Sequence, residues 1–261
     1  FLLEATQNNL NIPKIKDSLK YMYDFFSEIR NGKKFVDGNF IEFFRHLFEK
    51  PEILEWEKFW LQRNKDLDKE IYGLVKWVNP NLSFGLNVWN RNHFNLIRKI
   101  QWPWKEQVEY SDWVKPITYQ HQSGEIFQRE IDIFGKTILD DLSSSELTKV
   151  FAKILGINET SLENLTQRGL DPDTYIYTQC KDAVRGVDGG SKVYMGIGID
   201  APRSSKDQAI CTPDIAYRSV LATYKAGGEG FVLSPNYSSM KLSNLDGVAK
   251  ALKELKIFKN E

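Results

Sequence analysis

The sequence predicts an α/β fold in which parallel strands alternate with helices, and two observations support this. Four short segments alternate apolar residues with small or polar ones, as strands with one covered face do. Helical patterns separate these segments, and this order is typical of a parallel sheet covered by helices. The expected strands are "LSFGLNVW" (82–89), "DWVKPITY" (112–119), "KVYMGIGID" (192–200) and "GFVLS" (230–234).

The composition fits a folded protein with a neutral partner. The 261 residues are 41% hydrophobic and 13% aromatic, which is enough for a sizeable core. Lys and Arg number 35, Asp and Glu also 35, and the basic residues are scattered along the chain. We therefore expect neither a nucleic-acid nor a membrane partner, and no apolar run approaches the roughly 20 residues of a membrane span. Cellular compartment and oligomeric state are left open.

Two long stretches outside the strands have helical periodicity. Residues 1–78 form a helical segment before the first strand, with "IKDSLKYMYDFFSEI" and the run from Glu52 to Val78 as its clearest parts. Residues 122–189 form a helical insertion, which is much longer than an ordinary connection between strands. Thr212 and Pro213 are typical of a helix start, and "LSNLDGVAKALKEL" predicts a final helix.

The residue pattern of the third strand predicts a barrel. Its apolar residues share one parity, whereas Gly196, Gly198 and Asp200 share the other. Strands of an open parallel sheet are apolar on both faces, so this pattern favours a barrel wall. A closed (β/α)8 TIM barrel has eight strands over about 250 residues, and only four are found here. We therefore expect residues 1–261 to be one partial TIM-barrel domain, its C-terminal part with about four βα units.

Asp200 is the candidate catalytic residue. In a (β/α)8 barrel the reactive groups lie at the carboxyl ends of the strands, and Asp200 closes the third strand on the glycine parity. Two glycines before it leave room for a ligand. The alternative is an aspartate that caps a helix or anchors a loop.

The other strand ends predict a carbohydrate site. Trp89 and Tyr119 offer flat faces for a sugar ring, although Trp89 alternatively plugs the barrel mouth. Hydrogen bonds to hydroxyl groups would come from polar side chains near these ends. The substrate-binding candidates are Asn87, Trp89, Tyr119, His121, Arg203 and Asn236, with Gln120 beside them.

Lys115 and the two cysteines need separate interpretations. Lys115 is a cation within an apolar strand, and two alternatives stay open for it. It is either an inward amine able to form a Schiff base, or a side chain that extends along a helix to solvent. Cys180 and Cys211 lack a C-x-x-C spacing, so we expect small core residues, no metal site and no cofactor.

Three segments resemble the C-terminal half of bacterial TIM-barrel proteins grouped with the glycoside hydrolases. They are "DWVKPITYQH", "VYMGIGID" and "CTPDIAYRSVLATYKAGGEGFVLSPNYSSMKLSNLDGVAKAL", and the likeness covers about residues 53–121 and 191–256. The resemblance implies a carbohydrate-active barrel that uses two carboxylates. It places Asp200 at the end of the seventh barrel strand, where these enzymes usually carry a glutamate. The partner carboxylate is expected upstream, after the fourth strand.

Three hypotheses follow. The first is a glycoside hydrolase in which Asp200 is one of two catalytic carboxylates. The second is a barrel that binds carbohydrate without turnover, and the third is a Schiff-base lyase that uses Lys115. No cofactor is expected for any of them.

Overall fold

A computed structural model describes residues 2–89, 91–200, 206–234 and 240–257. The chain forms two compact units, residues 1–71 with 131–147 and residues 72–130 with 148–261. The N-terminal helices build a hydrophobic core of their own within the first unit.

The first unit is helical, as the pattern in residues 1–78 predicts. Its core gathers aromatic and aliphatic side chains around Phe25, and His46 lies in this core with its ring edge against Phe25. Glu52 accepts a hydrogen bond from Ser18 and pairs with Lys14. The helices that contribute to it are α1 (Leu2–Gln7), α2 (Ile12–Arg30), α3 (Asn39–Glu49) and the first part of α4 (Glu52–Val78).

The second unit is built on a four-stranded parallel sheet in the order β1-β2-β3-β4. The strands are β1 (Gly85–Val88), β2 (Trp113–Pro116), β3 (Lys192–Gly198) and β4 (Gly230–Ser234). This confirms an α/β fold with the four strands that the sequence predicts, although β1, β2 and β3 are shorter than expected and β3 ends at Gly198, before Asp200. The long pattern 122–189 is helical, and its last helix packs on β3, so part of it covers the sheet.

Short helices connect the strands, and longer helices cover the sheet. Between β1 and β2 lie α5 (Arg91–Phe94), α6 (Leu96–Gln101), α7 (Trp104–Gln107) and the 3₁₀ turn η1 (Val108–Tyr110). Between β2 and β3 lie α8 (Gln120–Gly135), α9 (Ser144–Leu155), α10 (Leu165–Arg168) and α11 (Pro172–Val187). The last two helices are α12 (Pro213–Lys225) and α13 (Leu242–Glu254).

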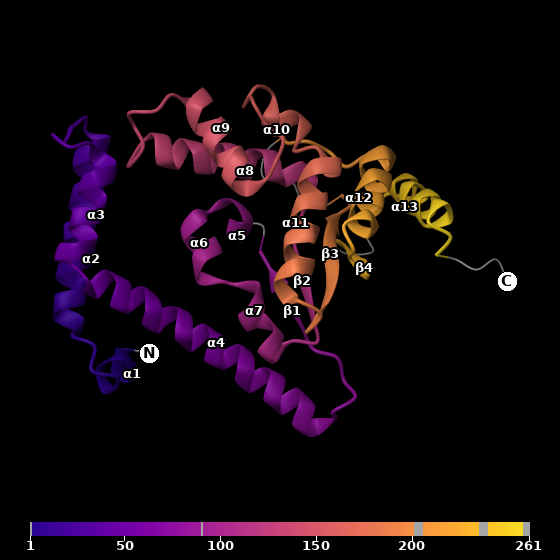
Figure 1. Ribbon diagram of the computed structural model, residues 1–261, viewed down its shortest axis with the longest axis horizontal. Coiled ribbons are helices and arrows are strands. Elements are labelled where there is room, and N and C mark those ends of the chain that lie inside the picture. Colours follow the sequence, from indigo (N-terminus) through magenta and orange to yellow (C-terminus); the bar gives the residue numbers. More distant parts are fainter. Residues whose placement is uncertain (1, 90, 201–205, 235–239, 258–261) are drawn as a thin grey trace. The chain divides into compact units, whose positions relative to one another are not determined.

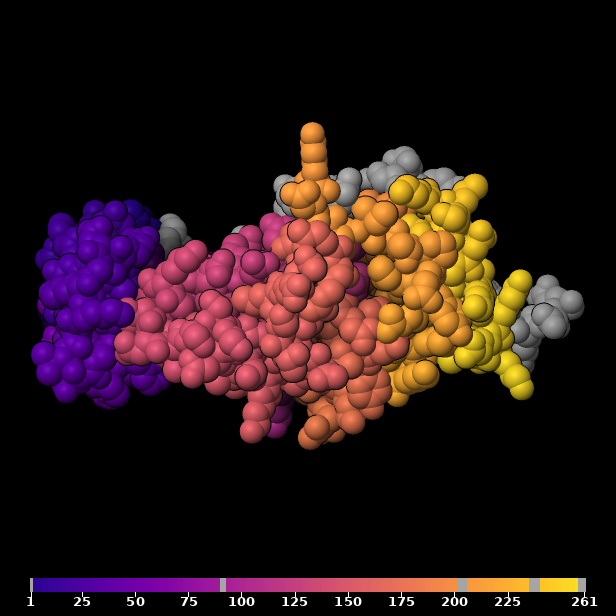
Figure 2. All heavy atoms as spheres, turned by 90° about the horizontal axis from the view of Figure 1, so that it is seen from above, coloured from indigo at the N-terminus to yellow at the C-terminus, as the bar shows by residue number. Residues whose placement is uncertain are grey.

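The two faces of the sheet differ as the alternation in the sequence predicts. Ile197 and Ile199 lie in a core with α12 and α13, which pack side by side in both views (Figure 1, Figure 2). Thr212 accepts a hydrogen bond from the backbone of Ile215, which confirms the predicted helix start. The opposite face carries the glycines of β3 together with half-buried side chains from β2.

The helices found in the described ranges include none that is long and apolar enough to span a membrane.

Candidate functional site

The glycine face of β3 is bare because side chains of the neighbouring strand lie across it. A Cβ atom added to Gly196 would stand 3.0 Å from Cε of Lys115 and 3.2 Å from Cα of Ile117. Contacts this short mean that a side chain at position 196 would make the lysine or the backbone of β2 shift. The glycine therefore makes room for the extended lysine side chain.

Lys115 crosses β3 and reaches β4. Its Nζ donates a hydrogen bond of 3.2 Å to Oγ of Ser234, the last residue of β4. Burial lowers the pKa of the Lys115 ammonium below its ordinary value. Among the described residues, no carboxylate forms an ion pair with this amine. Lys115 therefore lies on the sheet face, as in the inward alternative, and brings a cation to the carboxyl end of β4.

Tyr119 and His121 occupy the same face one step further along. A Cβ atom added to Gly198 would lie 2.5 Å from Cε1 of His121 and 2.9 Å from Cβ of Tyr119. The two rings are nearly parallel, with centroids 6.2 Å apart, and His121 is buried. His121 belongs to the first turn of α8, since β2 ends at Pro116 and the helix begins at Gln120. The structure therefore brings these two predicted residues together above β3.

Asp200 is held at the amino end of α13. Its Oδ2 accepts hydrogen bonds from the backbone N–H of Lys241 (2.7 Å) and from Nδ2 of Asn244 (3.0 Å). The Lys241 ammonium lies 3.8 Å from Oδ1, and the aspartate side chain is 11% exposed. These contacts match the helix-capping alternative. The backbone of Asp200 is left-handed, with φ of 55°, which is uncommon outside glycine.

The remaining predicted binding residues are placed less closely. Trp89 follows β1 and is 65% exposed. Asn87 is exposed on β1 and pairs in register with Lys115. Arg203 and Asn236 lie outside the described residues.

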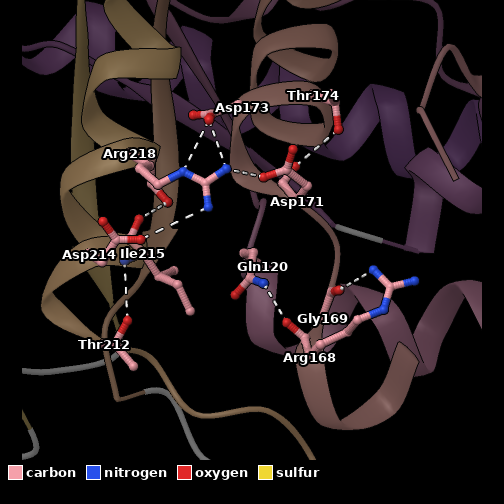
Figure 3. A network of polar contacts seen from close by, with 11 residues as sticks. Gln120, Arg168, Gly169, Asp171, Asp173, Thr174, Thr212, Asp214, Ile215 and Arg218 are labelled. Atoms are coloured by element: carbon pink, nitrogen blue, oxygen red, sulfur yellow. Dashed lines mark hydrogen bonds and ion pairs between the residues drawn. The ribbon is translucent and has the colours of Figure 1, made fainter. Parts of the chain in front are cut away.

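Gln120 is buried and makes a structural hydrogen bond, so its side chain does not face the solvent. Its Nε2 donates a hydrogen bond of 2.9 Å to the backbone oxygen of Arg168, next to Gly169 (Figure 3). In the same view Arg218 of α12 pairs with Asp171 and Asp173 at the start of α11. The Arg218 pairs fix the amino end of α11 beside α12, and the Gln120 bond joins the start of α8 to the end of α10.

The sequence pattern did not predict a buried polar pair, His93 and Tyr175. Nδ1 of His93 lies 3.2 Å from the hydroxyl of Tyr175, and both side chains are buried. Burial lowers the pKa of His93 to about 3 and raises that of Tyr175. Ser123 on α8 donates a hydrogen bond of 2.8 Å to the backbone oxygen of Tyr119. The only signal was a histidine at the start of a short helical pattern, which says nothing of its burial.

Metal ligands do not gather anywhere in the described ranges, where no group of three or more His, Cys, Asp or Glu could hold an ion. Both cysteines are free and buried, as the absence of paired spacing predicts. Comparisons with protein families, with curated proteins and with solved structures found no match to this chain.

Proposed function

We propose that this chain is the C-terminal half of a carbohydrate-binding (β/α)8 barrel, with its site at the carboxyl ends of β1–β4. The observation that carries the proposal is the sequential strand order β1-β2-β3-β4 in a parallel sheet. Parallel connections are right-handed in nearly all proteins, so successive neighbours advance in one direction and place their helices on one face. A doubly wound sheet instead reverses direction at a switch point.

The residues at the strand ends support a site for a ligand rich in hydroxyl groups. They combine the half-buried ring of Tyr119 with the exposed Asn87 and Trp89 at the end of β1. Aromatic faces stack on the apolar side of a sugar ring, and amide groups bond its hydroxyls. Strand ends are where barrels place their ligand contacts.

Binding to a panel of polysaccharides in affinity electrophoresis tests this function. We expect Trp89→Ala to weaken binding about fivefold or more, since one stacked ring contributes on the order of 1 kcal/mol or more. Trp77→Ala is the matched control, because Trp77 is also exposed, at 82%, but lies on α4. Equal retardation of both variants and the unmodified chain would contradict a sugar site at Trp89.

Hydrolysis is the second candidate, and the left-handed backbone of Asp200 favours it. Non-glycine residues in this conformation carry strain that is often found at functional sites. Asp200 would be one carboxylate of the pair that glycoside hydrolysis requires. The second carboxylate is expected upstream of this chain, as the resemblance implies.

Two variants separate catalysis from helix capping. In assays of the full-length protein with aryl glycosides, Asp200→Asn keeps an acceptor for the cap and removes the reactive carboxylate, whereas Asn244→Ala weakens the cap alone. A catalytic Asp200 predicts that Asp200→Asn lowers kcat about a hundredfold or more while Asn244→Ala does not. Similar kcat values in the two variants would show that Asp200 caps the helix and takes no part in catalysis.

A further inference from the structure

The sheet face that we propose as the sugar site contains one cation that no described carboxylate neutralises. Lys115 has the hydroxyl of Ser234 as its polar partner, at 3.2 Å. Its neighbours on this face are uncharged or aromatic, namely Gly196, Ile117 and, one step along, Tyr119. A half-buried ammonium without a counter-ion is costly, and a bound anion would offset that cost.

The amine of Lys115 lies near the carboxyl ends of the strands. The side chain starts in the middle of the sheet, level with Asn87, and extends over Gly196 to the last residue of β4. Nζ therefore lies near the strand ends, in the layer where Gly198 and Ser234 pair in register. Ser234 is buried, and its hydroxyl fixes the direction of the amine.

We propose that Lys115 binds the carboxylate of an acidic sugar, so that the site selects uronate-containing carbohydrate. This inference rests on the proposed function and names its substrate class. An ammonium donates up to three hydrogen bonds, and among the described residues one goes to Ser234, so two have no acceptor there and can bond a carboxylate. Anion binding is favoured over imine formation because the hydrogen-bond partner of Lys115 is a hydroxyl, with no carboxylate paired to the amine to move protons during the condensation.

The test compares a galacturonate oligosaccharide with its carboxyl-reduced, neutral counterpart by isothermal titration calorimetry. We expect the unmodified chain to bind the acidic form at least about tenfold more tightly, as for a charged hydrogen bond. Lys115→Met should remove this preference and leave binding of the neutral form unchanged. Lys115→Arg, which keeps the charge, should retain it.

Lys192→Met is the matched control. Lys192 has the same parity on β3 as the two glycines but stands at the amino end of the strand, and it is exposed. This variant should keep the preference for the acidic ligand. Preference should also weaken with added salt, because the attraction is electrostatic.

The outcomes separate failure of this inference from failure of the proposed function. Equal affinity of the unmodified chain for both oligosaccharides, or an unchanged preference in Lys115→Met, would overturn the acidic-sugar assignment and leave sugar binding intact. Absence of binding to either oligosaccharide would contradict sugar binding and the inference together. A mass gain at Lys115 after an aldose is added with cyanoborohydride, if exposed lysines gain none, would show a nucleophilic amine and overturn the ionic role.

Discussion

Lys115 on β2 and Ser234 on β4 are joined by a hydrogen bond of 3.2 Å that crosses the strand between them. The bond exists because β3 carries Gly196 at the crossing point, where a Cβ atom would meet the lysine at 3.0 Å. Sequence alternation places Lys115 within an apolar strand, and the extended side chain brings its amine to the carboxyl end of β4.

Gly198 is expected to tolerate no side chain. Gly198→Ala would set its Cβ 2.5 Å from His121 and 2.9 Å from Tyr119, so these rings must move. We expect the free energy of unfolding in urea to fall by about 1–3 kcal/mol. Gly73→Ala is the control, because position 73 lies in α4 with no atom within 4 Å, and it should stabilise by up to about 1 kcal/mol. An unchanged free energy of unfolding in Gly198→Ala would show that the rings of Tyr119 and His121 do not occupy this space.

Asp200→Ala is expected to destabilise α13. It removes two hydrogen bonds at the start of the helix, which for a helix cap costs about 1 kcal/mol, and puts alanine in a left-handed conformation. Asp188→Ala is matched for conformation, since Asp188 has φ of 48° and is exposed. The difference between the two variants in urea unfolding measures the cap. If both variants lose the same free energy of unfolding, the side chain of Asp200 adds no stability through the cap, and only its left-handed backbone matters.

His93 is expected to make stability fall with acid. Its pKa is about 3 in the folded chain and near 6.5 when unfolded, so the unfolded state binds the extra proton between these values. The contribution of the neutral, buried His93 to the free energy of unfolding is complete above pH 6.5. It declines as the pH falls toward 3, by at most about 1.4 kcal/mol per pH unit. Urea unfolding between pH 7.5 and 5 measures the slope. His93→Gln should have a smaller slope, and an identical slope would place His93 in contact with water.

The two thiols are expected to be unreactive in the folded chain. Burial raises the pKa of both Cys180 and Cys211 to about 12, and the thiolate is the reactive form. Treatment with iodoacetamide at pH 8 should leave both unmodified, whereas both should react in guanidinium chloride. Modification of either cysteine under native conditions would show that its surroundings open readily.

The strands and helices follow from local pattern, and the sequence predicts them well. The alternation in "KVYMGIGID" separates Ile197 and Ile199, which pack on helices, from the glycines. The start of α12 at Thr212 and Pro213 is equally local, because a cap needs only nearby residues. Division into two units was not predicted, since it depends on which helices share a core. Closure of the sheet into a barrel remains a prediction.

Side-chain partners depended on the tertiary structure. The chain determines by itself that Lys115 and Gly196 stand on strands and which parity each one has, because alternation is a property of the extended backbone. Only strand pairing decided that the lysine would cross that glycine to Ser234, and only the approach of α13 decided that Asp200 would bond its first turn. Both contacts join residues more than 40 positions apart along the chain, at separations of 119 and 41 residues, so no local pattern encodes them.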